Sequence, residues 1–268
     1  MTTLLNTSMN YLILTPDGVG STILQRLITM TLYLEKYDVI NTHELTNGIE
    51  LKNGIAVKNF ELGYNQSLKE ITNILKDSLE QTTLISRLAK YHLDDRNDSV
   101  DDCQHFYAFL NQHFNKKIMC VRENIFEYAM SWSIRAQSGV LNVYSKDDRD
   151  KVLQVSEIDE DYFIAKCQKY VGYITWMENN FSNVETVSYE NIIKDSDAVM
   201  QKLTGHRNTF VDNIGLPLST ILTNEYDVLK NETENNLSKI DSKALVRYRM
   251  LSNEMINKNV IFDIPFKN

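Results

Sequence analysis

The segment Tyr11–Leu27, YLILTPDGVGSTILQRL, decides the fold that we expect for this chain. Its apolar start, Tyr11–Leu14, is typical of a buried strand, the glycines after Pro16 indicate a tight turn, and Ser21 opens an apolar, helix-compatible run. A helix that begins at such a turn presents unpaired backbone N–H groups and the positive end of its dipole. The segment therefore predicts an anion site. The alternative is an ordinary strand–turn–helix joint with Ser21 as its N-cap.

Two common nucleotide-binding motifs do not fit this segment. An ATP-type P-loop needs a Lys directly before its Ser or Thr, and here Gly20 precedes Ser21. A dinucleotide fingerprint needs a third glycine after Gly18 and Gly20, and none stands at that spacing.

The composition is that of an ordinary globular protein, with 268 residues, 43% hydrophobic and 24% charged. The net charge of −8 argues against general nucleic-acid binding. Cys103, Cys120 and Cys167 form no CxxC motif, which favours reduced thiols inside a cell. The sequence lacks a signal-peptide pattern and a run of about 18 apolar residues, so we expect a cytoplasmic protein without a membrane span. No metal-ligand motif is present, and we expect no metal site.

Strand-like and helix-like segments alternate along the chain. We expect strands over 11–14, 54–60, 82–88, 117–121 and 184–189, and helices over 21–36, 68–79, 103–114, 124–137, 161–180, 195–203 and 242–255. His43–Glu44 falls in a polar stretch, and the acidic run Asp94–Asp102 is expected as a loop that caps the next helix. This alternation predicts a parallel sheet covered on both faces, with the loops after Leu14 and Val121 at one edge.

A second segment carries candidate binding residues. Arg122 directly follows the strand-like run KIMCV, and Ser131 lies nine positions further on, in the expected helix. An Arg at the carboxyl end of a strand is well placed for bidentate phosphate contact, and a Ser on the next helix can donate to the same group. The alternative is a surface Arg paired with Glu123 or Glu127.

Together the two segments resemble the sulfotransferases that use 3′-phosphoadenosine 5′-phosphosulfate (PAPS). TPDGVGSTILQRL stands in place of that family's P-[RK]-[ST]-G-[ST]-T loop and helix, and VRENIFEYAMSWSIRAQSG resembles its strand–Arg–helix–Ser element. The Arg122–Ser131 spacing and the R-A-Q-S-G stretch at 135–139 are closest to the bacterial trehalose 2-sulfotransferase branch. GIAVKNF and V-S-Y-E-N at 187–191 are weaker echoes, so the resemblance spans residues 11 to 191.

The resemblance implies a P-loop-like three-layer α/β/α sulfotransferase fold with a central parallel sheet. It implies one domain over residues 1–268, with about 205–268 as a mostly helical extension. The implied reaction moves a sulfuryl group from PAPS to an acceptor hydroxyl, on a carbohydrate or another small molecule, without a metal. Glu44 is the implied general base, with His43 as the second candidate, and Arg122 and Ser131 would bind the 3′-phosphate. The 5′-phosphosulfate would lie on the loop residues Gly18, Val19, Gly20, Ser21 and Thr22.

The chain departs from the family pattern at one position of the loop. The family carries a Lys or Arg two residues before the loop glycine, and Gly18 stands there. Arg26 or Lys58 could compensate for the missing charge. Two alternatives therefore stay open: a degenerate sulfotransferase fold that only binds a nucleotide, and a P-loop nucleotide kinase, which the missing Lys disfavours. A homodimer is also left open.

Overall fold

The fold comes from a computed structural model, which describes residues 9–16, 18–59, 61–79, 82–140, 150–151, 154–155 and 158–207. The described residues form two compact units. The first contains the residues up to Val121 and those from Trp176 onward, and the second contains residues from Arg122 to Thr175. The expected helix over 242–255 and nearly all of the expected extension lie outside the described residues.

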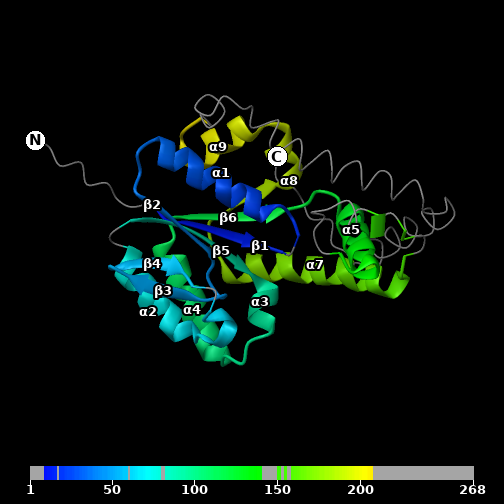
Figure 1. The fold of residues 1–268 in the computed structure, drawn as a ribbon, viewed down its shortest axis with the longest axis horizontal. Helices are drawn as coiled ribbons and strands as arrows, with labels where there is room; N and C mark the ends of the chain where they lie inside the picture. The colour runs from blue at the N-terminus through cyan, green and yellow to red at the C-terminus, as the bar shows by residue number, and fades with distance from the viewer. Residues whose placement is uncertain are drawn as a thin grey trace, which may run out of the picture. The chain divides into compact units, whose positions relative to one another are not determined.

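A five-stranded parallel sheet forms the centre of the first unit (Figure 1). Its strands lie in the order β2-β5-β1-β6-β7 and span Val39–Glu44, Thr83–Ala89, Tyr11–Thr15, Lys116–Val121 and Val184–Ser188. All four strand pairings are parallel. Every residue of β1 is buried, as expected for a continuous apolar run in the middle of a parallel sheet. The expected α/β class is confirmed.

The strand register fixes which loops share an edge. Leu14 of β1 lies opposite Leu88 of β5 on one side and Met119 of β6 on the other. The carboxyl ends of these three strands therefore lie together, as the alternating pattern predicts. The chain leaves β1 toward one side of the sheet and leaves β6 toward the other, so the topological switch point lies between β1 and β6.

Helices cover both faces of the sheet, which gives three layers (Figure 1). α1 (Ser21–Leu34), α8 (Tyr189–Lys194) and α9 (Ser196–Thr204) lie on one face. α2 (Leu68–Leu79), α3 (Lys90–Asp94) and α4 (Val100–His113) lie on the other. Ser99 caps α4 by accepting a hydrogen bond from the Asp102 N–H group, so the acidic run ends in a helix cap as expected.

We expected no strand in the polar stretch that contains His43–Glu44, but these residues end strand β2. The sequence does not show the usual alternation of apolar and polar residues of a strand, because Thr42 and Glu44 take the buried positions that apolar residues usually occupy. Thr42 shares a hydrogen bond of 2.7 Å with Ser86 on the neighbouring strand, which satisfies both hydroxyls inside the sheet.

The run GIAVKNF does form a strand, but outside the parallel sheet. β4 (Ile55–Lys58) pairs with β3 (Ile49–Lys52) in a separate antiparallel hairpin, which the short helix η1 (Gly63–Asn65) follows. The parallel strand next to β1 is β5, which contains Arg87. The hairpin places Lys58 opposite Ile49, just beyond the end of β2.

In its described residues, the second unit includes α5 (Ile125–Ser138) and the part of α7 (Glu160–Asn180) up to Thr175. Two aromatic pairs join the helices, Phe126 with Phe163 and Tyr128 with Tyr170, at centroid distances of 5.3 and 4.5 Å. Asn124 caps α5, which confirms the helix expected from this position.

Candidate functional site

The loop between β1 and α1 has the backbone of an anion site. Gly18 and Gly20 take left-handed φ values of 70° and 78°. The Gly20 carbonyl accepts hydrogen bonds from the N–H groups of Ile23 and Leu24 at 3.0 and 3.2 Å. The first N–H groups of a helix, here those of Ser21 and Thr22, have no carbonyl partner within it. The N-cap of α1 is Gly20 and not Ser21, so this detail of the alternative is wrong, while the binding of an anion by the loop stays a prediction.

The Tyr189 ring holds this loop from the neighbouring β7–α8 joint. A Cβ atom added to Gly20 would lie 2.2 Å from the Cδ2 atom of Tyr189, far closer than two carbon atoms can approach. Glycine is therefore required at position 20 by both its φ angle and this contact. The Sγ–H group of Cys120 on β6 also donates to the Val19 carbonyl at 3.4 Å. The loop is fixed from two neighbouring strands.

Arg87, which sequence reasoning missed, brings a positive charge to this loop. It lies near the carboxyl end of β5 and is only 8% exposed. Its guanidinium donates to the Thr22 hydroxyl, lies 3.4 Å from the Ser21 hydroxyl and forms an ion pair with Glu44. The available signal was a single Arg inside the apolar run TTLISRL, since a buried Arg needs a partner.

Glu44, the predicted general base, lies at the centre of this cluster. Its carboxylate is buried, pairs with Arg87 and lies 3.5 Å from the Nδ1 atom of His92. Burial acts to raise the pKa of Glu44, but the hydrogen bond with His92 and the charge of Arg87 outweigh it and lower this pKa. Glu44 is therefore ionised at neutral pH, which a base requires, although a lowered pKa also makes it a weaker base.

His43, the second candidate base, lies at an irregularity of β2. The register between β2 and β5 shifts between Asn41 and His43, and His43 takes a φ of 60°. The buried amide of Gln25 donates to the His43 carbonyl at 3.1 Å and to the Ile85 carbonyl at 3.2 Å, which holds the bulge on α1. Burial and the charge of Arg87 lower the pKa of His43, so the ring is neutral at pH 7.

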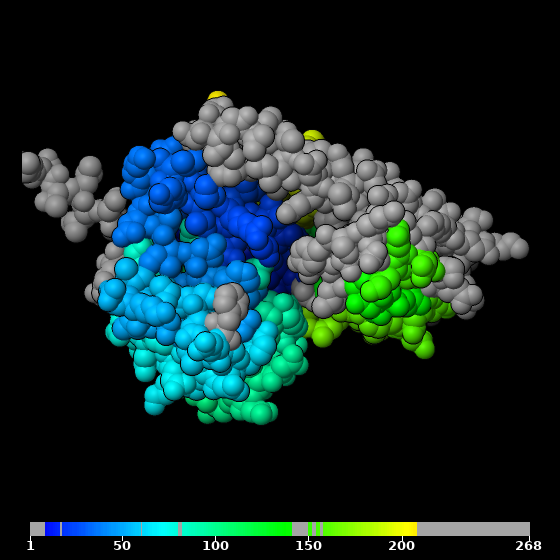
Figure 2. All heavy atoms as spheres, viewed as in Figure 1, coloured from blue at the N-terminus to red at the C-terminus, as the bar shows by residue number. Residues whose placement is uncertain are grey.

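The two residues expected to compensate for the loop's missing charge differ in position. Lys58 is half-buried, donates to the Asn47 carbonyl and interacts electrostatically with both Glu44 and Arg87. Arg26 is exposed on α1, although its charge reaches His43. The structure thus brings Lys58 into the cluster and leaves Arg26 at its periphery. Figure 2 shows α1 and the segment from β2 through the β3–β4 hairpin adjoining on one face of the first unit.

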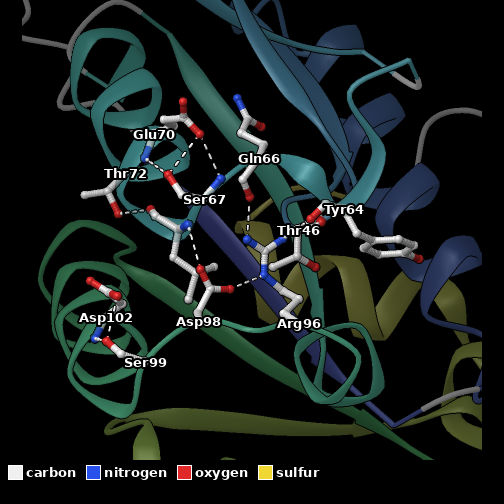
Figure 3. A network of polar contacts seen from close by, with 11 residues as sticks. Thr46, Tyr64, Gln66, Ser67, Glu70, Thr72, Arg96, Asp98, Ser99 and Asp102 are labelled. Atoms are coloured by element: carbon white, nitrogen blue, oxygen red, sulfur yellow. Dashed lines mark hydrogen bonds and ion pairs between the residues drawn. The ribbon is translucent and has the colours of Figure 1, made fainter.

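A network around Arg96 holds the segment that follows Glu44 (Figure 3). The Arg96 guanidinium donates to the carbonyls of Thr46, Tyr64 and Gln66 and pairs with Asp98. It therefore joins the end of β2, the η1 segment and the acidic run by donors that a guanidinium presents in a fixed fork. Asp98 is thus the member of the acidic run that pairs with the Arg joining these segments.

The predicted 3′-phosphate ligands belong to the second unit. The Arg122 N–H group donates to the Tyr170 hydroxyl at 2.8 Å, and that hydroxyl donates to the Arg122 carbonyl at 2.9 Å. This exchange fixes the backbone where β6 ends and the second unit begins. Ser131 is half-buried on α5, next to Trp132, whose ring lies 4.1 Å from the ammonium of Lys166. The binding roles of Arg122 and Ser131 stay predictions.

An open groove of about 430 Å³ lies beside η1 and α2. Its walls are formed by Leu62, Asn65, Gln66, Glu70, Asn73 and Ile74, and none of the predicted site residues contributes to them. In the described ranges, no three His, Cys, Asp or Glu side chains gather closely enough to bind a metal ion. Cys103, Cys120 and Cys167, all among the described residues, form no disulfide.

The fold is that of an α/β protein whose central parallel sheet carries a glycine-rich loop and a buried Arg–Glu pair at one edge. No protein-family model matches this chain, and no curated protein is significantly similar to it. Over the part of the chain that the structure describes, no helix is long and apolar enough to cross a membrane.

Proposed function

We propose that the chain is a sulfotransferase that moves a sulfuryl group from PAPS to an acceptor hydroxyl, on a carbohydrate or another small molecule. The main support is the cluster in which Arg87 bonds the Thr22 hydroxyl at the start of α1 and pairs with Glu44. Backbone N–H groups at a helix start and an adjoining guanidinium suit a phosphosulfate anion. The cluster supplies from β5 the positive charge that the loop lacks.

The hydroxyls at the start of α1 can donate to such an anion. Because Arg87 donates to the Thr22 oxygen, the hydroxyl proton of Thr22 remains for another acceptor. In the proposed reaction, the bond between sulfur and the bridging oxygen of PAPS breaks while the acceptor oxygen bonds to sulfur. Negative charge then grows on the bridging oxygen, where the Ser21 and Thr22 N–H groups and the Arg87 guanidinium would stabilise it.

The proton of the acceptor hydroxyl passes to a base, and the products are a sulfate ester and 3′-phosphoadenosine 5′-phosphate (PAP). We propose Glu44 as this base, because it is ionised and adjoins the cation that would hold the sulfuryl group. His43 is the second candidate, because its neutral ring can also accept a proton. Arg122 and Ser131 are proposed to bind the 3′-phosphate.

Two variants separate the candidate bases. Glu44→Gln should lower turnover by roughly 10²–10⁴-fold, the usual contribution of a general base, while PAP affinity does not fall because Arg87 keeps its charge. His43→Asn keeps a residue that tolerates a positive φ and should retain most of the turnover. The opposite pattern would assign the base to His43.

A thermal-shift titration with PAP, ATP–Mg²⁺ and NAD tests the proposal first, followed by transfer assays with PAPS and sugar acceptors. A ligand at 100 times its Kd stabilises the native state by about 2.7 kcal/mol. We expect a shift with PAP and sulfate ester formation. Stabilisation by ATP–Mg²⁺ but not PAP would instead favour a nucleotide kinase.

A second function is a nucleotide-binding module without transfer activity. The lowered pKa of Glu44, which weakens it as a base, and the glycine at position 18 favour this reading. PAP binding without transfer to any offered hydroxyl would support it. The cytoplasmic location, the carbohydrate acceptor and a homodimer remain predictions.

A further inference from the structure

The cluster around Glu44 carries more positive than negative charge. Two charged groups act on the Lys58 ammonium, the Glu44 carboxylate at the end of β2 and the Arg87 guanidinium on β5. His43 experiences the charges of Arg87, Lys58 and Arg26 against that of Glu44 alone. Arg87 and Lys58 thus share a single carboxylate, Glu44, with Arg26 at the periphery, an arrangement that a bound anion would stabilise.

The hairpin places the Lys58 side chain near the end of β2. Lys58 ends β4, lies opposite Ile49 and donates to the Asn47 carbonyl, only three residues after Glu44. The second hairpin lysine differs, because Lys52 is exposed at the other end and pairs with Glu50. The chain thus has one hairpin lysine within the cluster and one matched lysine outside it.

We propose that Lys58 acts with Arg87 as a two-cation clamp for the 5′-phosphosulfate, replacing from the β3–β4 hairpin the basic residue that the loop lacks. This inference rests on the proposed function and adds a residue to its anion site. Arg87 would hold the oxygens nearest the start of α1, and Lys58 those nearest Glu44. Lysine suits this position because its ammonium is a compact point charge with three donors on a flexible stem.

The clamp predicts that Lys58 takes up protons when the nucleotide binds. Burial lowers the pKa of Lys58 to about 8, with Arg87 adding to the shift and Glu44 opposing it. At pH 8 about half of the Lys58 side chains are therefore neutral in the free protein. A bound anion favours the charged form, so Lys58 should take up as much as about half a proton when the nucleotide binds at that pH.

Isothermal titration with PAP at pH 8, in two buffers of different ionisation enthalpy, measures both affinity and proton uptake. The phosphates of PAP contribute little, since their second pKa is near 6. Lys58→Met should weaken PAP binding by roughly 10–100-fold, as expected for a lost charge-assisted contact, and should abolish the uptake. Lys58→Arg should bind within a few-fold of wild type without proton uptake, because Arg does not titrate.

Lys52→Met is the matched control and should change neither the PAP affinity nor the proton uptake. If wild-type protein binds PAP and Lys58→Met binds it equally, with the same uptake, the clamp is overturned and the proposed function survives. If Lys58→Met binds PAP weakly but Lys58→Arg takes up as many protons as wild type, another group takes up the proton. That result would overturn the inference that Lys58 becomes protonated when PAP binds. If wild-type protein does not bind PAP, the proposed function and the clamp fail together.

Discussion

Replacing Arg87 by Met removes the cation from the centre of the cluster and tests the arrangement independently of any function. Met fills much of the volume of the Arg side chain, so little cavity cost is expected. The main effect falls on Glu44, which would stay buried with the Nδ1 atom of His92 at 3.5 Å and the more distant charge of Lys58. Removing one partner of a buried ion pair costs about 3–5 kcal/mol.

The loss of stability in Arg87→Met should depend on whether Glu44 is present and on the pH. In Glu44→Gln/Arg87→Met both charges are absent, and we expect a loss of about 1 kcal/mol or less. In the wild type, the lowered pKa of Glu44 contributes stability above the ordinary carboxyl pKa, and this is lost as the pH falls through the lower folded value. In Arg87→Met, burial without Arg87 should raise that pKa, so the penalty is largest at pH 7 and shrinks as Glu44 becomes protonated.

Urea and thermal denaturation, followed by circular dichroism at pH 7 and pH 4.5, measure these effects. With roughly 2–4 °C per kcal/mol for a chain of about this size, Arg87→Met should melt about 6–20 °C below wild type at pH 7. Arg26→Met replaces an exposed arginine of α1 and should stay within about 0.5 kcal/mol. Equal stability of Arg87→Met and wild type at pH 7, or a double variant as unstable as Arg87→Met, would refute the buried pair.

Two further predictions concern the loop and the second unit. Gly20→Ala should destabilise the protein by at least 1 kcal/mol, because the new Cβ meets the Tyr189 ring at 2.2 Å and φ is 78°; a melting temperature equal to that of wild type contradicts this. Arg122→Ala should weaken PAP binding by about 1.5–3 kcal/mol, as for a lost charge-assisted contact, and Ser131→Ala by less. Calorimetry that finds wild-type affinity in Arg122→Ala would remove its proposed role.

The sequence predicts the layers of this fold well because its parallel strands are continuous apolar runs. Tyr11–Leu14 and the run before Arg122 both read as buried strands, and both are neighbours in the sheet. Strand β2 escaped detection for the opposite reason. Its inward positions hold Thr42 and Glu44, whose polar groups pair with Ser86 and Arg87 on β5.

The candidate site was predicted in part for a related reason. The loop glycines and hydroxyls are contiguous in the chain, so a local pattern reveals them. The partner of those hydroxyls is Arg87, about 65 residues away, and nothing in TTLISRL indicates that β5 lies between β1 and β2. A buried cation can be noticed in a sequence, but its partner depends on the strand order.

The position of the positive charge changes what the anion loop has to do. A lysine within the loop loses side-chain entropy of up to about 2 kcal/mol when an anion fixes it. Arg87 is already held by Glu44 and Thr22 in the protein without ligand, so much of that loss has occurred during folding. A preorganised donor costs less reorganisation when charge develops on the ligand. For this reason Gly18 is compatible with a working anion site, and Glu44 can act both as the proposed base and as the group that orders Arg87.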